Sequence, residues 1–348
     1  MGLSLHISIV PVILMVVSLQ VWLPLGCLQE ERAALLQLKD SLNYPNGTSL
    51  PSWTKGDAHC CYWESVECSY TGRVTELYLG GVRNGELRDW YLNASLFLPF
   101  QELITLYLAD NQMAGWVENK GVYQPFKMNK LEHLDLGYNR LNNSILSYLD
   151  WFSSLKTLDI SYNRLEGLID LKECPSNLEA LYLSGKNITK VVALGGPTNL
   201  SALYLNNITA YGSSFQTLLQ SLGAFPNLTT LGLGDNDLRG RILGDAFLNL
   251  KNLELLDLSY NTLNSSNIFQ TIRIMTSLKT LRLWDCSLNG QLPTGLCDLN
   301  HLEDLDISYN DLSGFLPPCL ANLTSLQQLD LSSNHLKIPM SLSPLYNL

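Results

Sequence analysis

Apolar residues return along most of this 348-residue chain in one pattern, which reads L-x-x-L-x-L-x-x-N-x-L. Residues 302–312 fit it without an exception, and the same frame recurs at residues 131–141, 155–165, 228–238, 253–263 and 326–336, and at 103–113 with Met in the last position. We number the positions of this frame as places one to eleven. Each copy is predicted to form a short strand whose residues at places four and six face a core.

The copies follow one another at intervals of 22 to 29 residues. Their first places are Val74, Leu103, Leu131, Leu155, Leu178, Leu200, Leu228, Leu253, Leu278, Leu302 and Leu326. A period of about 20–29 residues with this core is typical of a leucine-rich-repeat solenoid, in which each copy forms one turn. We therefore predict an α/β fold, a right-handed solenoid of about 11 turns over residues 74–348, whose length counts turns and not domains.

Place nine is expected to hold an asparagine that bonds backbone groups inside the coil. It does so at Asn111, Asn139, Asn163, Asn236, Asn261, Asn310 and Asn334. Cys286 replaces it in one turn, a substitution that the repeat pattern allows, and it is expected to be buried and reduced. Lys186 and Ile208 replace it in two consecutive turns and cannot make the same bonds. An irregular, bent or loosened solenoid is therefore expected between residues 178 and 228.

The formal net charge is −10, the isoelectric point is near 4.9, and no basic run is present. This balance argues against nucleic acid and against polyanionic pectate as the main partner. The first 26 residues carry no charged side chain and are mostly apolar, which predicts a signal peptide over residues 1–26, ending before Cys27. An uncleaved signal anchor is the alternative. Both interpretations send the rest of the chain into the secretory pathway.

Residues 27–73 are predicted to cover the open apolar edge of the first turn, which every solenoid must shield. Leu35, Leu38 and Leu42 fall on one face of a predicted helix. Cys60 and Cys61 are adjacent and poorly placed to bond each other, so each needs a separate partner in an oxidising compartment.

We pair Cys27 with Cys60 and Cys61 with Cys68. A zinc site made by His59 and the last three of these cysteines is the alternative, although its spacing fits no common zinc pattern.

The cap reads Cys27-Leu-Gln-Glu-Glu-Arg-x-Ala-Leu-Leu-x-Leu-Lys, followed by Trp53, by Cys60-Cys61-x-Trp63-x-x-Val66-x-Cys68 and by Arg73-Val74. These residues resemble the N-terminal cap of plant extracellular leucine-rich-repeat proteins, and most closely that of plant receptor-like proteins. The resemblance implies a module of the apoplast or plasma membrane that recognises a peptide, protein or glycan in defence or development. Because it lacks a kinase, it would signal through a co-receptor or adaptor receptor kinase. Family members continue with more repeats, a cap and a membrane span, so this chain is expected to be a fragment or shortened product, open at its C-terminal end.

Several turns continue as Leu-x-Gly-x-(Leu/Ile)-Pro, as at residues 288–293 and 312–317. This extension resembles the plant-specific repeat subtype, in which a second short strand follows the first. Residues 112–130 and 213–225 are longer insertions, and the second is expected to form a short helix through Phe215, Leu218, Leu219 and Leu222. Cys297 and Cys319 lie at similar places in successive turns about 5 Å apart, which predicts a third disulfide. Cys174 has no assigned partner.

Nine Asn-x-Ser/Thr sequons are expected to be largely glycosylated in a secreted chain, although unused tripeptides are the alternative. They are Asn46, Asn93, Asn142, Asn187, Asn199, Asn207, Asn227, Asn264 and Asn322.

Places three, five and seven point out of the core and are expected to tile the concave face. Arg282 and Trp284 form the first candidate ligand site, because an exposed Trp beside an Arg has the composition of an interface hot spot. Surface packing of Trp284 against Arg282 and the next turn is the alternative. A second candidate is the set of tyrosines at place five: Tyr78, Tyr107, Tyr182 and Tyr204.

Enzyme chemistry is not expected, and neither is a cofactor or a metal site. The five histidines form no spaced pair that could bind a metal or activate a nucleophile, and no kinase landmark is present. Recurring carboxylates such as Asp304 and Asp306 follow the repeat itself and are expected to form a solvated strand face. The alternative function is a secreted inhibitor of cell-wall-degrading hydrolases, similar to the polygalacturonase inhibitors.

Overall fold

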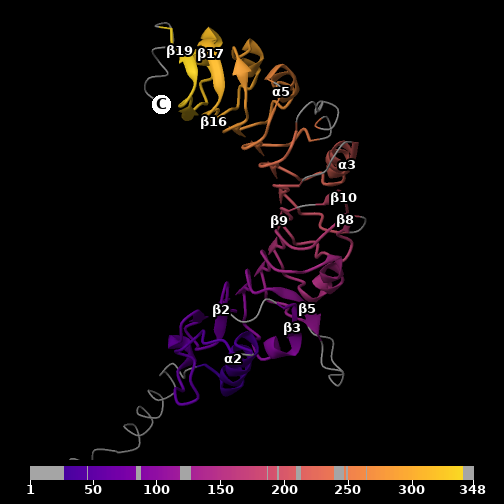
Figure 1. Cartoon of the computed structure of the whole chain (residues 1–348), viewed down its shortest axis with the longest axis vertical. Helices are drawn as coiled ribbons and strands as arrows, with labels where there is room; N and C mark the ends of the chain where they lie inside the picture. The colour runs from indigo at the N-terminus through magenta and orange to yellow at the C-terminus, as the bar shows by residue number, and fades with distance from the viewer. Residues whose placement is uncertain are drawn as a thin grey trace, which may run out of the picture.

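The computed structural model describes residues 27–44, 46–83, 88–117, 127–185, 187–193, 196–208, 213–238, 247, 250–263 and 265–339. The turns follow one another along an arc, with the cap at its N-terminal end (Figure 1). The predicted signal segment, Lys186, Asn264 and the last nine residues lie outside the described residues.

One 12-stranded sheet lines the inner side of the arc (Figure 1). Its strands, in spatial order, are β1 (Val66–Cys68), β2 (Val74–Tyr78), β4 (Thr105–Tyr107), β6 (His133–Asp135), β7 (Thr157–Asp159), β9 (Ala180–Tyr182), β11 (Ala202–Tyr204), β12 (Thr230–Gly232), β13 (Leu255–Asp257), β14 (Thr280–Arg282), β16 (Asp304–Asp306) and β18 (Gln328–Asp330). β1 pairs with β2 in antiparallel fashion, and β2 and β4 begin the parallel series. Each predicted turn contributes one parallel strand, which confirms the solenoid.

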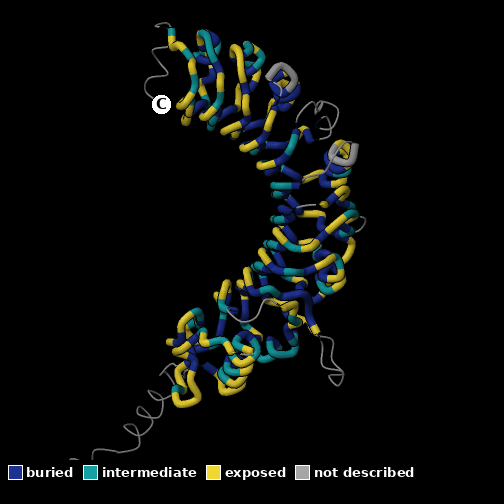
Figure 2. The backbone as a smooth tube through the Cα atoms, in the orientation of Figure 1, coloured by how far each residue is buried: buried dark blue, intermediate teal, exposed yellow. Residues whose placement is uncertain are grey.

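The repeated leucines explain why the strands stack in this way. Leu305 at place four, in β16, and Ile307 at place six, directly after it, are fully buried, whereas Asp306 between them is only half-buried. Buried residues run through the whole length of the arc (Figure 2). Because each turn leaves apolar surface on both sides, neighbouring turns must stack to form one continuous core.

The other elements lie on the outer side of the arc (Figure 1). Second strands pair as β3 (Trp90–Asn93) with β5 (Met113–Val117), as β8 (Gly167–Asp170) with β10 (Ile188–Val192), and as β15 (Asn289–Gly290) with β17 (Asp311–Phe315) and β19 (His335–Lys337). The helices are α3 (Ser213–Ser221) and α5 (Ser265–Ile272), with the 3-10 helices η2 (Ala94–Phe97), η3 (Asn143–Trp151), η4 (Leu222–Ala224), η5 (Thr294–Asp298) and η6 (Pro318–Asn322). The expected helix is therefore α3, which buries Leu218 and Leu219, and part of the first predicted insertion is instead β5.

Place-nine asparagines connect successive turns as predicted. Asn139 donates from Nδ2 to the carbonyl oxygens of Leu108 and Leu136 at 2.9 and 3.0 Å. Its Oδ1 accepts the backbone N–H groups of Asn111 and Met113 in the preceding turn, at 3.0 and 2.9 Å. One buried amide thus satisfies backbone groups of two turns, which an apolar residue cannot do.

In the turn of Cys286, the thiol takes the place of the asparagine Nδ2 as the donor to backbone carbonyl oxygens. Its Sγ lies 3.1 Å from the carbonyl oxygen of Leu258, in the preceding turn, and 3.5 Å from that of Trp284. The thiol is buried and free, and burial raises its pKa to about 12. Cys174 is also buried and free.

The expected loosening between residues 178 and 228 was wrong for the sheet. β9, β11 and β12 stay paired in register, with Leu181, Leu203 and Leu231 side by side. A second set of bonds at place seven accompanies these turns, in which Ser184 N–H donates to Ser161 Oγ at 3.1 Å. Asn206 N–H then donates to Ser184 Oγ at 3.1 Å, and Gly234 N–H to Asn206 Oδ1 at 2.8 Å.

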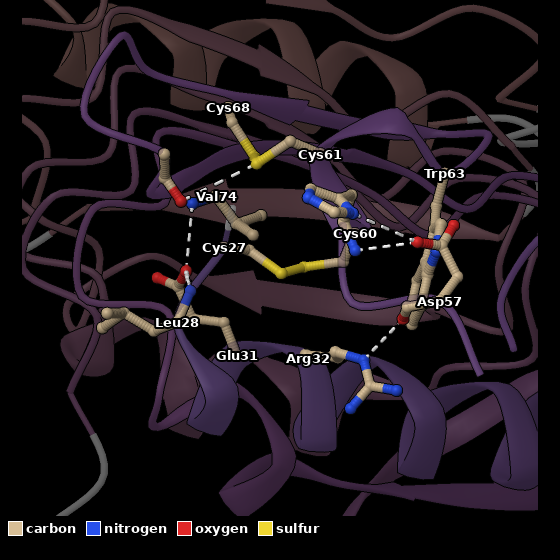
Figure 3. The surroundings of a disulfide bond; sticks show 12 residues. Cys27, Leu28, Glu31, Arg32, Asp57, Cys60, Cys61, Trp63, Cys68 and Val74 are labelled. Carbon is tan, nitrogen blue, oxygen red and sulfur yellow. Dashed lines mark hydrogen bonds and ion pairs between the residues drawn. A yellow bond between two sulfur atoms is a disulfide. The ribbon is translucent and has the colours of Figure 1, made fainter. Parts of the chain in front are cut away.

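The N-terminal cap is a helix, α2 (Gln29–Leu42), held to the first strands (Figure 3). Its Glu31 is fully buried and accepts from Arg73 Nε at 2.9 Å, Val74 N at 3.3 Å and Leu28 N at 3.4 Å. This carboxylate joins the start of the helix to the start of β2. The guanidinium of Arg83 adds a second link, since it donates to the carbonyl oxygen of Leu42 at the end of the helix.

Disulfides join Cys27 to Cys60, in the 3-10 helix η1 (Cys60–Tyr62), and Cys61 to Cys68 (Figure 3). These are the pairs assigned from the sequence, and they remove the three thiolates that the zinc alternative required. Among the described residues, no group of three or more His, Cys, Asp or Glu side chains is arranged to hold a metal ion. A third disulfide links Cys297 in η5 to Cys319 in η6, on the outer side of two successive turns.

Candidate functional site

Aspartates at place five have a structural function at the ends of the inner strands. In five turns the aspartate Oδ1 accepts the backbone N–H two residues later, at distances from 2.7 to 2.9 Å. The pairs are Asp135 with Gly137, Asp159 with Ser161, Asp257 with Ser259, Asp306 with Ser308 and Asp330 with Ser332. This bond closes a local turn of the kind that Asp favours.

The inner face is hollowed toward its C-terminal half. The hollow measures about 1120 Å³ and is lined from β13 to β18, with contributions from earlier turns. Its lining residues are Tyr162, Asn206, Gly234, Asp235, Asp257, Ser259, Tyr260, Arg282, Trp284, Asp304, Asp306, Gln327, Gln328, Leu329 and Asp330. Both members of the first predicted site, Arg282 and Trp284, therefore lie in it.

Trp284 is the centre of an aromatic group that spans three turns. Its ring lies edge-to-face against Tyr260 at 4.2 Å between centroids and against Tyr309 at 5.7 Å. Trp284 is half-buried, while the tyrosines keep 50% and 57% of their surface exposed. The contact with Tyr309 is the packing on the next turn that the alternative expected, whereas the ring contacts are with tyrosines and not with Arg282. These contacts hold the indole in place, and the exposed parts of the three rings stay open to a ligand.

Arg282 projects from β14 beside the acidic residues of β16. Its Nη2 lies 3.9 Å from Asp304 Oδ2, and its side chain is about half exposed. Burial raises the pKa of Asp304 above its ordinary value, and the nearby Arg282 charge acts in the opposite direction. The guanidinium therefore keeps donors for a ligand, since this contact uses one edge of the group.

The four tyrosines of the second predicted site form two separate stacks. Tyr78 and Tyr107 stack at 5.1 Å between centroids, and Tyr182 and Tyr204 at 4.4 Å. The strands β6 and β7, with aspartates at place five, separate the two stacks, so they do not form a single cluster. A hydrogen bond from Tyr78 to Glu76 raises the pKa of the Tyr78 phenol to about 12.

Gly232 gives the second stack its space. A β-carbon built on Gly232 would lie 2.6 Å from Cδ1 of Tyr204, so a larger residue would collide with the ring. None of the four tyrosines lines the hollow.

Tyr260 and Tyr309 were missed in the sequence, because only places three, five and seven were expected to face outward. Both occupy place eight, and both have positive φ angles, of 59° and 53°. The backbone conformation at this place turns the side chain back over the inner face. Tyr138 and Tyr162, at the same place, stack on each other at 4.5 Å. A tyrosine directly before the place-nine asparagine was the available signal.

Most of the sequons can accommodate a glycan. Asn46, Asn142, Asn187, Asn199, Asn227 and Asn322 are exposed, and Asn93 and Asn207 are half-buried. The side chain of Asn93 accepts from Ser95 N at 3.0 Å, where it begins η2.

Comparison with known proteins agrees with this architecture. A leucine-rich-repeat N-terminal domain matches residues 28–69, and leucine-rich-repeat models match residues 127–149, 154–173 and 276–336. Cuscuta receptor 1 of Solanum lycopersicum is 34% identical over 283 residues, which are 74% of this chain and 24% of that receptor. Receptor-like protein 9a of Arabidopsis thaliana is 43% identical over 175 residues, which are 49% of this chain and 18% of that protein.

The chain is a leucine-rich-repeat protein that is similar to the plant receptor-like proteins. It spans about a quarter of the length of these relatives or less. Among solved structures, the ectodomain of the Arabidopsis receptor kinase HAESA, in complex with the peptide hormone IDA and the co-receptor SERK1, is 22% identical, with a TM-score of 0.46. That alignment covers 89% of this receptor-like chain and 58% of the other. Within the described part of the receptor-like chain, no helix has the length and apolar content needed to cross a membrane.

Proposed function

We propose that this chain is a non-catalytic recognition module that binds an extracellular peptide, protein or glycan in the hollow of its inner face. The observation that carries the proposal is the hollow itself, of about 1120 Å³, with a fixed tryptophan between two exposed tyrosines. Concave sites with a few aromatic anchors and a few polar groups are the usual form of ligand sites. The rigid strands beneath hold the anchors in place before the ligand arrives.

We also propose that the chain acts outside the cell or at its surface, in defence or development, together with a partner receptor kinase. Similarity to receptor-like proteins supports the receptor-like part of this proposal, and three disulfides support an oxidising compartment. In this proposal the ligand-bound chain passes its signal to that kinase.

A binding array tests the proposal directly. The labelled full chain is presented to an array of synthetic peptides and plant or microbial oligosaccharides of known composition. We expect at least one bound component whose signal is lost in Trp284→Ala and kept in Phe315→Ala. Phe315 is a suitable control, because it is 64% exposed but lies on β17, away from the hollow.

Two results would contradict the proposal. One is an array without any bound component, and the other is equal binding by Trp284→Ala and the wild-type chain. Potent inhibition of a fungal polygalacturonase by the unmodified chain would instead support the inhibitor function.

A further inference from the structure

We infer that the hollow takes a cationic peptide segment, one that presents arginine or lysine side chains to the aspartates around Trp284. This inference rests on the proposed function, since it assumes that the hollow is a binding site, and it names the chemical class of the ligand. It follows from the charge of the lining, the geometry of the carboxylates and the aromatic group among the lining residues.

The charges that line the hollow are unbalanced. Five aspartates line it, namely Asp235, Asp257, Asp304, Asp306 and Asp330, against one cation, Arg282. No lysine is among the lining residues, and Arg282 already lies beside Asp304. An anionic ligand would meet this surplus of negative charge, whereas a cationic one would neutralise it.

The carboxylates are fixed before any ligand binds. In Asp257, Asp306 and Asp330 the Oδ1 atom accepts a backbone N–H at 2.8 to 2.9 Å, which holds each side chain through one of its two oxygens. Ser308 Oγ also donates to Asp306 Oδ1, at 2.6 Å. Asp306 and Asp330 stand directly opposite each other in the paired strands β16 and β18. Such fixed acceptors suit the several N–H donors of a guanidinium or ammonium group, because little side-chain entropy is lost on binding.

The aromatic group suits the same ligand. A guanidinium or ammonium group is attracted to an aromatic ring face within about 6 Å, and most strongly to tryptophan. Trp284 and Tyr260 lie among the lining residues, next to Asp257 and Asp306. A side chain with an apolar stem and a cationic end can therefore contact both the rings and the carboxylates.

Two matched double variants distinguish binding in the hollow from attraction to the overall negative charge of the protein. Asp257→Asn/Asp306→Asn removes two charges inside the hollow, and Asp135→Asn/Asp159→Asn removes two charges at the same place of earlier turns, outside the hollow. Asparagine keeps an oxygen for the backbone N–H in all four positions, so both variants preserve the local turn. Both variants lower the formal negative charge by two, one inside the hollow and the other outside it.

The probes are three blocked octapeptides, (Arg-Ser)4, (Gln-Ser)4 and (Glu-Ser)4, titrated against the secreted full chain by isothermal calorimetry. We expect (Arg-Ser)4 alone to bind, with an affinity that falls as salt is added. Binding should weaken roughly tenfold in the hollow variant and change less than about twofold in the control variant. Trp284→Ala should weaken it as well.

Three results would overturn the inference. Equal weakening by the two double variants would show attraction to the overall charge of the protein. Equal binding of (Gln-Ser)4 would show that the hollow accepts neutral ligands, and the proposed function would then survive. Absence of (Arg-Ser)4 binding, while the array yields a ligand sensitive to Trp284→Ala, would reject the cationic class and keep the binding site.

Discussion

Asp135 and Asp159 show that an aspartate at place five can lower the stability of the fold while it makes a favourable bond at the strand end. Both are half-buried, and burial raises the pKa of each carboxyl above its ordinary value of 3.8. The backbone N–H bonds of Gly137 and Ser161 act in the opposite direction without cancelling that effect. Both charges therefore cost stability at neutral pH, although the bond that each side chain makes is favourable.

Asp159→Asn is expected to raise the melting temperature at pH 7, because it keeps an acceptor for Ser161 N–H and removes the buried charge. A raised folded-state pKa gives stability that is complete below the unfolded value of 3.8 and is lost as pH rises through the folded value. The advantage of the variant should therefore disappear as pH falls toward that value. Calorimetry from pH 3.5 to 7 measures it, and an equal gain from Asp330→Asn, at an exposed site, would show that burial is not the cause.

Glu31 is the residue on which the cap depends. Glu31→Ala would leave the Arg73 guanidinium and the N–H groups of Val74 and Leu28 without their acceptor. Breaking a buried pair in this way is expected to cost about 3 kcal/mol, measured by urea denaturation. Glu30→Ala, one position earlier and exposed, is the control, and a similar loss in both variants would contradict this assignment.

The inner strands and their asparagines were predictable from the sequence, because the same physical requirement recurs in every turn. Leu305, Ile307 and Asn310 must fill the same positions as their counterparts 24 or so residues away, so the pattern reports them many times. The place-seven bonds from Ser161 to Gly234 occur once and depend on the relative position of four turns. A single sequence gives no repeated signal for such bonds.

Of the aromatic group, the sequence predicted Trp284 but not Tyr260 or Tyr309. Trp284 stood out as an exception to small residues at place seven, but its partners belong to a place whose backbone conformation is not visible in the leucine pattern. The separation of the tyrosines into two stacks likewise depends on how many turns lie between them.

Replacing one asparagine tests how far each inner strand depends on this bonding. Asn310→Ala would remove the acceptor of Cys286 N–H and Leu288 N–H and the donor to Leu283, at 3.0, 2.9 and 2.9 Å. Unpaired backbone groups of this kind should lower the free energy of unfolding by about 2–3 kcal/mol. Asn300→Ala, at an exposed position between η5 and β16, is the control. If Asn310→Ala lowered the free energy of unfolding no more than this control does, the structural role of Asn310 would be contradicted.

Across the whole molecule, each turn interacts chiefly with its two neighbours, so damage should remain local. Cys297→Ser/Cys319→Ser opens a link between residues 22 apart, and chain entropy predicts a loss of about 3 kcal/mol. Amide hydrogen exchange should accelerate around η5 and η6 and leave the strands β4 to β9 unchanged. Faster exchange throughout the arc would indicate a solenoid that unfolds as a single unit.

Glycosylation is the second property of the whole molecule to test. Six of the eight sequon asparagines that the structure describes are exposed, and we expect the secreted chain to move faster on a denaturing gel after glycosidase treatment. Asn142→Gln and Asn322→Gln should each remove one glycan and so reduce that change in mobility. No change in mobility would contradict both glycosylation and passage through the secretory pathway.

The aspartates at place five separate two properties that are coupled in most folds, namely the shape of the backbone and the side chain that the surface presents to a ligand. One oxygen accepts the backbone N–H at the strand end, a bond that Asn can also make, so Asn can replace Asp without altering the backbone. Glycine or tyrosine occurs at the same place in other turns. Evolution can therefore change the ligand preference of this face one turn at a time, under little constraint from folding. A lineage of such receptors could follow a changing ligand by successive single substitutions, each inherited on an unchanged scaffold.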